Sequence, residues 1–239
     1  MTSAAGKQET GLMNSFDDIF AIAAERRGGA SAVERLLERP KSIGDLNAIG
    51  DDRWLAGMTQ AVFNAGFNWK VIEAKWDGFE AAFDGFDIHR NALLGDDDLD
   101  RLTRDTRIVR NGAKIRSVQQ NAQLLVELKA ERGNADHQLA AWPATDFTGL
   151  VEMLGKRGSR LGGGTAQYFL RQMGRDGFIL GGDVVSRLIA EGVVDKPPTS
   201  KAAMRAVQDA FNLWMTQSGR SLTEISRVLA LSIGEVRYR

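Results

Sequence analysis

The chain contains no cysteine, and only two of its 239 residues are histidine. The absence of cysteine excludes disulfides, thiolate nucleophiles and Cys-ligated zinc or iron–sulfur clusters. Because His89 and His137 stand far apart in unrelated contexts, we expect no metal site. Long apolar runs are also missing, since no segment reaches the roughly 20 apolar residues of a membrane span and the N-terminus does not read as a signal peptide. These absences favour a cytoplasmic protein that does not engage a membrane.

The chain also lacks an excess of either charge, with 31 Lys and Arg against 31 Asp and Glu. A general polycation is therefore excluded, and any nucleic-acid contact has to come from local patches. One basic patch runs from Arg101 to Arg116 and includes Arg110 and Lys114, and a second runs over 156–175 without a single acidic residue. Spaced charges of this kind also occur on ordinary solvated helix faces, so each patch has two interpretations.

The overall composition, 43% hydrophobic and 26% charged, is typical of a soluble globular protein whose core fills one large domain or two lobes. Apolar residues recur at helical spacing in many segments, while no sustained alternation marks a strand, which predicts an all-α fold. We expect helices to begin after the caps Ser15, Asn68, Ser200 and Ser221, with the second one running from Trp69 to Phe83.

The most informative stretch is 149–171, where a short amphipathic segment leads into a turn rich in glycine and cations, followed by a second helix. This pattern indicates a helix-hairpin-helix with its hairpin at about 154–166 and its second helix starting at Thr165 or the residue before. Glycines allow backbone N–H groups at a helix N-terminus to approach a phosphate. The expected DNA contacts are Lys156, Arg157, Arg160, Gly162, Gly163, Gly164 and Thr165, together with Arg110 and Lys114. The simpler alternative is a glycine C-cap and loop.

Asp183 lies 183 − 165 = 18 residues after Thr165, at the start of another apolar-periodic run. On its own, an aspartate in this position is sufficiently explained as a helix N-cap.

The hairpin, the Thr165-Ala166 pair and the following aspartate resemble the helix-hairpin-helix DNA glycosylases. The resemblance implies a two-lobed helical bundle in which Asp183 is the catalytic aspartate. Bifunctional members carry a lysine immediately before the Thr-Ala pair, whereas this chain has Gly164, which implies a monofunctional enzyme that hydrolyses only the N-glycosidic bond. Hairpin carbonyls in this superfamily can hold a monovalent cation, and no other cofactor is expected.

Four further stretches resemble the bacterial 3-methyladenine DNA glycosylase I family over roughly residues 45–185. They are the segments at 64–72, 79–87, 108–115 and 121–122. By this resemblance Trp69 stacks on the extruded base. We expect Gln60, Phe63 and Asn64 to share the base pocket, where Gln60 and Asn64 would read the edge of the base; the alternative is that these two are ordinary solvated side chains on a helix surface. An alkylated base that carries positive charge would then gain cation–π attraction from the Trp69 ring.

Departures from the family pattern bear on the substrate. The family's pocket glutamate corresponds to Ala61, its upstream Tyr-His-Asp segment is absent, and its Cys/His zinc clip cannot be built. The sequence therefore predicts a monofunctional glycosylase that excises an alkylated, 3-methyladenine-like purine from double-stranded DNA as a monomer, associated with the nucleoid through DNA binding. The alternatives are a glycosylase for another damaged or modified base, a non-catalytic DNA-binding module, and a helical protein–protein scaffold.

We expect three parts along the chain. These are N-terminal helices over 1–45 that pack on the core, a glycosylase core over 46–195, and C-terminal helices over 196–239 that complete the second lobe, after the break at Pro197-Pro198.

Overall fold

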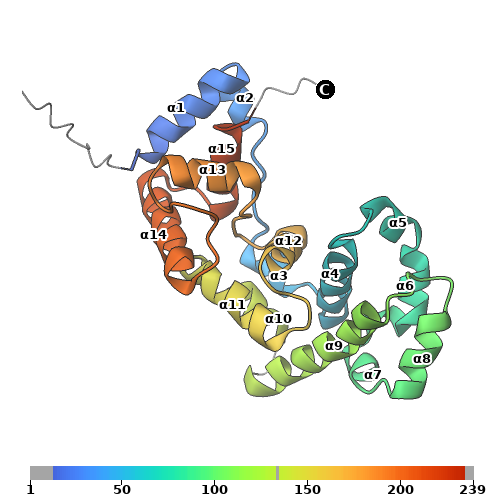
Figure 1. Cartoon of the computed structure of the whole chain (residues 1–239). Helices are drawn as coiled ribbons and strands as arrows, with labels where there is room; N and C mark the ends of the chain where they lie inside the picture. Colours follow the sequence, from blue (N-terminus) through green and yellow to red (C-terminus); the bar gives the residue numbers. More distant parts are fainter. Residues whose placement is uncertain (1–12, 133–134, 235–239) are drawn as a thin grey trace, which may run out of the picture. The chain divides into compact units, whose positions relative to one another are not determined.

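The computed structural model describes residues 13–132 and 135–234, and within these residues the secondary structure is helical with no strand (Figure 1). The all-α prediction is therefore confirmed. None of the helices in this part of the chain is long and apolar enough to span a membrane. The chain divides into two compact units.

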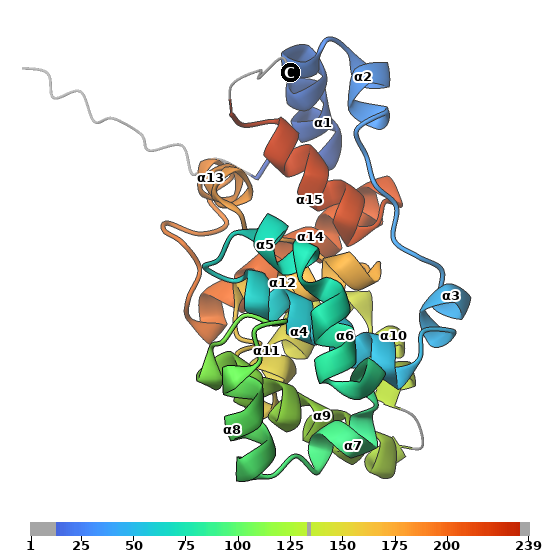
Figure 2. The same ribbon diagram turned by 90° about the vertical axis from the view of Figure 1, so that its right-hand side faces the viewer.

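Unit 1 is assembled from segments toward both ends of the chain, and its described residues are 13–38, 180–220 and 224–234. Its helices are α1 (Phe16–Arg27), α2 (Ala30–Glu34), α13 (Gly182–Ala190), α14 (Lys201–Ser218) and α15 (Leu222–Leu231), whose first two residues belong to unit 2. Helices α1, α2 and α15 lie side by side (Figures 1 and 2), and Arg27 donates to the Leu231 carbonyl at 3.1 Å. Fully buried Phe211 and Trp214 of α14 fill the core.

A buried ion pair ties the ends of unit 1 together. The Arg187 guanidinium, on α13, lies 3.2 Å from the Glu191 carboxylate, and these residues are 7% and 6% exposed. The same guanidinium donates to the Ser232 hydroxyl at 2.8 Å, while Glu191 accepts from the Asn14 backbone at 2.8 Å. Each charge is thus paired and hydrogen-bonded, as a buried charge requires.

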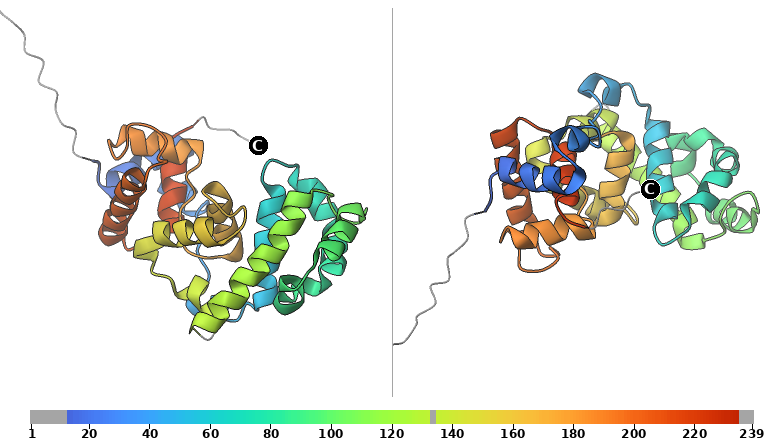
Figure 3. Two further views of the ribbon diagram at one scale, coloured as in Figure 1. Left: turned by 60° about the horizontal axis from the view of Figure 1, so that its bottom comes forward. Right: turned by 90° about the horizontal axis from the view of Figure 1, so that it is seen from above.

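Unit 2 comprises residues 39–179 and 221–223. Its α-helices are α3 (Ile43–Asn47), α4 (Asp51–Asn64), α5 (Trp69–Ala74), α6 (Trp76–Ala82), α7 (Ile88–Ala92), α8 (Asp96–Arg104), α9 (Gly112–Arg132), α10 (Ala135–Ala141), α11 (Phe147–Arg157) and α12 (Gly164–Met173). Two short 3₁₀ helices, Asp84–Phe86 and Ala144–Asp146, complete it. The long helix α9 packs against α4, α7, α8 and α10 and is the axis of the unit (Figure 3).

Helix α4 lies between α9 and α12 and is buried along most of its length. The Trp54 ring meets Phe169 of α12 edge-on, with ring centroids 5.8 Å apart. The side chains of α12 lie directly against Gly57 of α4, where a Cβ would collide with Met173 Sδ and lie 3.3 Å from the Phe169 ring. This close contact fixes α12, and with it the end of the hairpin, against α4.

Local capping follows the sequence closely. Ser15 and Asp18 form a capping box at α1, Asn68 accepts from the Lys70 amide at α5, and Ser200 caps α14. The single helix expected from Trp69 to Phe83 is wrong, because it breaks at Lys75 into α5 and α6. Non-local contacts lie at the break: the Lys75 ammonium donates to the Thr106 carbonyl at 2.7 Å, and α6 packs so closely on residues 106–107 that a Cβ on Gly78 would collide with the Arg107 backbone.

The three-part division into 1–45, 46–195 and 196–239 stays a prediction. The two compact units are defined by how densely residues pack, which does not test a division by function along the chain.

Candidate functional site

The glycine-rich turn is a tightly built hairpin. Helix α11 ends at Arg157, six residues follow, and α12 begins at Gly164, the residue before Thr165, as the sequence predicted. Leu161 is fully buried. A Cβ on Gly158 would lie 2.6 Å from the Leu154 carbonyl oxygen and 2.9 Å from Leu161 Cδ1, so the exit from α11 needs a glycine.

Asn121 of α9 holds the hairpin from beneath. Its side-chain oxygen accepts from the Ser159 amide at 2.7 Å, and its nitrogen donates to the Ser159 carbonyl at 3.1 Å. Asn121 is only 1% exposed, so water does not compete for these two bonds. The turn is therefore anchored to the central helix of its unit.

The outer side of the hairpin is open. Arg160 and Gly163 have left-handed backbone angles, with φ of 59° and 54°, which reverse the chain. A Cβ added at Gly162, Gly163 or Gly164 would have no neighbour within 4 Å. At the start of α12 the Thr165 amide donates to the Gly162 carbonyl at 3.2 Å and the Gln167 amide to the Gly163 carbonyl at 3.4 Å. The amides of Gly164 and Ala166 have no backbone acceptor in the described residues, as is usual in the first turn of a helix, and they lie on an uncrowded surface.

The hairpin cations differ in their availability. Lys156 pairs with Glu152 at 2.5 Å, and Arg157 pairs with Glu131 at 2.7 Å and Glu127 at 3.2 Å. Hydrogen bonding to Glu131 is the main cause that raises the pKa of Arg157 above its usual range. Arg160 is exposed and makes no side-chain hydrogen bond or ion pair within the described residues, and it is the cation best placed to meet a ligand.

Two cations of the basic patches, Arg175 and Lys114, donate hydrogen bonds to backbone carbonyls within the fold. Arg175 is 5% exposed, and its guanidinium donates to the carbonyls of Leu139 and Trp142, so it does not belong to a surface patch. Lys114 lies under the end of α4 and donates to the carbonyls of Phe63 at 3.1 Å and Ala65 at 2.8 Å. Burial, with a smaller contribution from nearby Arg160, lowers the pKa of Lys114. Arg110 is exposed, and its side chain makes no hydrogen bond or ion pair in the described part of the chain.

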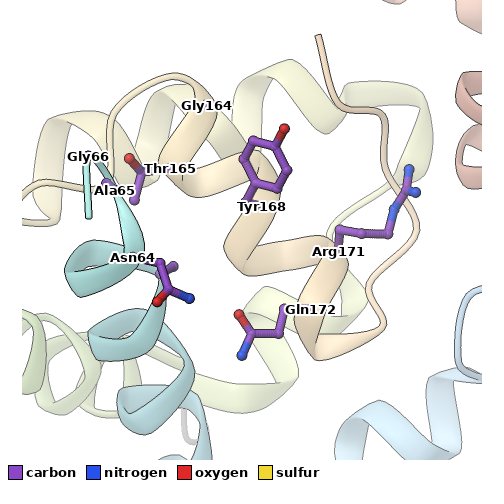
Figure 4. Close-up of a pocket in the computed structure, with 9 residues that line it drawn as sticks. Asn64, Ala65, Gly66, Gly164, Thr165, Tyr168, Arg171 and Gln172 are labelled. Carbon is purple, nitrogen blue, oxygen red and sulfur yellow. The ribbon is translucent and has the colours of Figure 1, made fainter. Parts of the chain in front are cut away.

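A pocket of about 590 Å³ lies beside the hairpin, within unit 2. Its walls come from the end of α4 with the turn that follows, and from α12 (Figure 4). The lining residues are Ala61, Asn64, Ala65, Gly66, Gly164, Thr165, Tyr168, Arg171 and Gln172. Asn64 and Gln172 face one another across it, and Asn64 Oδ1 is buried without a hydrogen-bond partner. The volume is within the range of about 300–1,000 Å³ common for small-molecule sites.

The four residues expected in the base pocket have different positions. Asn64 lines the pocket, and Gln60 accepts a hydrogen bond from Gln172 at its edge. Phe63 is fully buried and packs edge-on against Phe79 at 4.7 Å, so its ring belongs to the core. Trp69 is 57% exposed at the start of α5 and is not among the lining residues.

Sequence reasoning missed Tyr168, Arg171 and Gln172. Together with Thr165 they form a stripe on α12 opposite the buried face made by Ala166, Phe169, Leu170 and Met173. A polar stripe at positions i, i+3, i+6 and i+7 was the available signal, but helical spacing alone does not reveal that it faces α4.

Asp183 belongs to unit 1, in the first turn of α13. The helix cap is Gly181, without a side-chain capping bond, so the interpretation of Asp183 as an N-cap is wrong. Its exposed carboxylate makes no hydrogen bond or ion pair within the described residues. An uncommitted carboxylate at this position interacts favourably with the positive end of α13. No group of three or more His, Asp or Glu side chains suited to a metal ion occurs within 13–132 and 135–234.

Comparison with known proteins identifies the family. No curated protein gives a significant match. Among solved structures, a Tyr-to-Phe variant of 3-methyladenine DNA glycosylase I in complex with 3-methyladenine is similar at 22% identity and a TM-score of 0.48, covering 52% of this chain and 77% of that one. The Staphylococcus aureus 3-methyladenine DNA glycosylase I gives 23% identity and a TM-score of 0.46, covering 52% and 76%.

The family model for methyladenine glycosylases matches residues 47–185, which is more than half of the chain and includes α4, the pocket and the whole hairpin. The chain therefore belongs to the methyladenine glycosylase family of DNA glycosylases.

Proposed function

We propose that the protein is a monofunctional DNA glycosylase that extrudes an alkylated purine from duplex DNA and hydrolyses its N-glycosidic bond. The observation that carries the proposal is the pocket beside an open, anchored hairpin, inside the segment that matches the family. A base inside a duplex cannot be reached, so an enzyme of this kind must turn the nucleotide out and accept the loss of stacking, on the order of a few kcal/mol.

In this proposal the hairpin binds a backbone phosphate close to the lesion. The open Cβ directions at Gly162 and Gly164 leave room for phosphate oxygens to reach the α12 amides. Arg160 adds charge attraction, and Lys156 and Arg157 contribute less because their carboxylate partners already hold them. Phosphate contacts of this type position the duplex and carry no sequence information.

The extruded base then enters the pocket between Asn64 and Gln172, with Trp69 as the stacking ring. The exposure of Trp69, 57%, supports this role, because an unpacked indole at a turn has its face available to a ligand. The amide groups supply both donors and acceptors to the edge of the base.

We assign the hydrolytic step to Asp183. Water adds to C1′ of the deoxyribose, the C1′–N bond breaks, and the base leaves with the bonding electron pair. A cationic alkylated base becomes neutral in this step, whereas an uncharged one leaves as an anion and takes up the proton that the water releases. A carboxylate stabilises the positive charge that develops on the sugar and accepts a proton from the water. The absence of a lysine at position 164 supports hydrolysis without cleavage of the DNA backbone.

The test is the variant Asp183→Asn on an alkylated duplex under single-turnover conditions. We expect abasic sites, detected by alkaline cleavage of labelled DNA, to form at least about 100-fold more slowly, with duplex affinity within about threefold of the unaltered protein. Asp195→Asn, which changes an exposed aspartate after the same helix, is the matched control and should retain activity. Base release at an unchanged rate in Asp183→Asn would reject the catalytic assignment.

One rival function has a specific observation in its favour. Among the described residues, no carboxylate lines the pocket, which supports a glycosylase for a base other than 3-methyladenine. A non-catalytic DNA-binding module would bind duplex in a salt-dependent manner and form no abasic sites in the same assay.

A further inference from the structure

We propose that Gly234 is a positioning residue for the hydrolytic step, because its missing side chain keeps both oxygens of the Asp183 carboxylate open to the reacting water. The inference rests on the proposed function, in which Asp183 accepts a proton from that water, and it adds a second residue to the same site. Contacts within unit 1, between α13 and the turn at 232–234 that follows α15, carry it.

Gly234 lies directly against Asp183, although 234 − 183 = 51 positions separate them in the chain. A Cβ on Gly234 would lie 3.5 Å from Oδ2, 3.6 Å from Oδ1 and 3.7 Å from Cγ of Asp183. Apart from the residues next to Gly234 in the chain, these are the nearest heavy atoms to that position within the described residues. A side chain at position 234 would therefore rest on the carboxyl group and touch both of its oxygens.

The space between the turn and the carboxylate suits a water molecule. A hydroxyl group bonds to a carboxylate oxygen at about 2.7–2.8 Å, so a water fits where a methyl group would already be in contact. Both oxygens of Asp183 are exposed acceptors without a hydrogen bond in the part of the chain that the structure describes. A methyl group in this space would exclude water from one side of the carboxylate and would donate no hydrogen bond to it.

Helix α1 holds the turn from one side. The Arg27 guanidinium donates to the carbonyls of Leu231 at 3.1 Å and Ile233 at 3.0 Å. The Arg26 guanidinium donates to the carbonyl of Gly234 itself at 3.3 Å. Three carbonyls in four consecutive residues are thus fixed by two neighbouring side chains, which restricts where the backbone of the turn can lie.

Helix α13 holds the turn from the other side. The Arg187 guanidinium donates to the Ser232 carbonyl at 2.9 Å and to its hydroxyl at 2.8 Å. Arg187 follows Asp183 by four residues, so the two side chains lie one above the other on the same face of α13. The bonds that attach the turn to α13 therefore also set its distance from the Asp183 carboxylate.

The backbone conformation of Gly234 is a separate reason for a glycine and has to be controlled. Its φ of 79° is left-handed, which favours glycine whatever lies nearby. Gly219, which ends α14 in the same unit, has a φ of 67° and no atom within 4 Å of its Cβ position. Substitution at either glycine has a similar backbone cost, and only at Gly234 does the new side chain meet a carboxylate.

The experiment uses a labelled duplex methylated with dimethyl sulfate and measures two quantities, base release under single-turnover conditions at saturating protein and duplex affinity. We expect Gly234→Ala to slow release by at least about tenfold, and Gly234→Asn to slow it at least as much because its side chain is larger. Duplex affinity should stay within about threefold. The matched variants Gly219→Ala and Gly219→Asn should release base within about threefold of the rate of the unaltered protein.

The asparagine variants separate backbone strain from contact with the carboxylate, since asparagine adopts a left-handed angle more readily than alanine. Recovery of the rate in Gly234→Asn after a loss in Gly234→Ala would mean that strain is the cause, and would overturn the inference. Unchanged release in both Gly234 variants, beside a loss of at least about 100-fold in Asp183→Asn, would overturn it and leave the proposed function intact. Unchanged release in Asp183→Asn would reject the catalytic assignment itself.

Discussion

At the scale of single residues, the exposed Trp69 and the buried Phe63 show that two aromatic rings six positions apart have different roles. Phe63 is covered by Phe79 and by the ammonium of Lys114, so its removal would affect folding. Trp69 stands at a turn, capped by Asn68, where its ring covers little of the core. Only the second ring is available to a bound base.

We therefore predict that Trp69→Ala weakens binding to a lesion duplex by about tenfold or more, while binding to undamaged duplex changes by less than threefold. The expected loss corresponds to base stacking of about 1–3 kcal/mol. Fluorescence anisotropy on matched duplexes measures both affinities. Trp69→Phe, which keeps a ring, should recover most of the difference. Equal losses on both duplexes would show that the ring serves packing alone.

The sequence identified part of the pocket and missed the rest for a physical reason. Asn64 was predictable because it ends a helix next to a glycine turn. Tyr168 and Gln172 were not, because their alignment with Asn64 depends on the packing of α12 against α4 at Gly57. The distance of Asp183 from Thr165 made it a candidate catalytic residue. That it makes no capping bond could be seen only in the structure.

At the scale of elements, the hairpin depends on Asn121, whose two bonds to Ser159 are the link between the turn and α9. We predict that Asn121→Ala lowers the free energy of unfolding by about 1–3 kcal/mol and weakens duplex binding by about tenfold or more, because buried backbone groups at the turn lose their partner. Asn91→Ala is the control. Asn91 is equally buried and bonds two carbonyls of unit 2, at Phe83 and Asp87, so only stability should fall. Urea unfolding and anisotropy separate the two effects.

Gly164 offers a complementary test of the start of α12. In the free protein, a Cβ at Gly164 has no neighbour within 4 Å, and alanine is the better helix former. Gly164→Ala should therefore leave stability unchanged or raise it by about 0.5–1 kcal/mol. If a phosphate approaches the α12 amides, the same methyl group should reduce duplex affinity by about tenfold. Unchanged affinity would show that the backbone is not approached there.

Elements were predictable wherever the decisive interaction was local. The caps at Ser15, Asn68 and Ser200 bond amides only two or three residues ahead, so their sequence patterns were sufficient. The break at Lys75 was not predictable from the local sequence. The Lys75 side chain there donates to the Thr106 carbonyl, which lies 31 residues later in the chain.

At the scale of the whole molecule, unit 1 combines segments from both ends of the chain. No sequence pattern predicted that these segments form one compact unit. Within it, a buried ion pair joins Arg187 to Glu191. We predict that Arg187→Met lowers the free energy of unfolding by about 3–5 kcal/mol, because the buried Glu191 carboxylate would lose its ion pair and keep only its hydrogen bonds from Asn14. The double variant Arg187→Met, Glu191→Met should be more stable than the single one. Urea unfolding compares them, and a double variant no better than the single one would contradict the electrostatic cause.

The glycine at position 57 has a consequence for how this fold can change its substrate. It sits two helical turns before Asn64, and its missing side chain allows α12 to lie directly on α4. The aperture between Asn64 and Gln172 is thus governed from a buried position that no substrate touches. A larger residue there would have to displace the Met173 side chain and press on the Phe169 ring of α12. The packing of α12 on α4 can therefore change without any alteration of the residues that line the pocket.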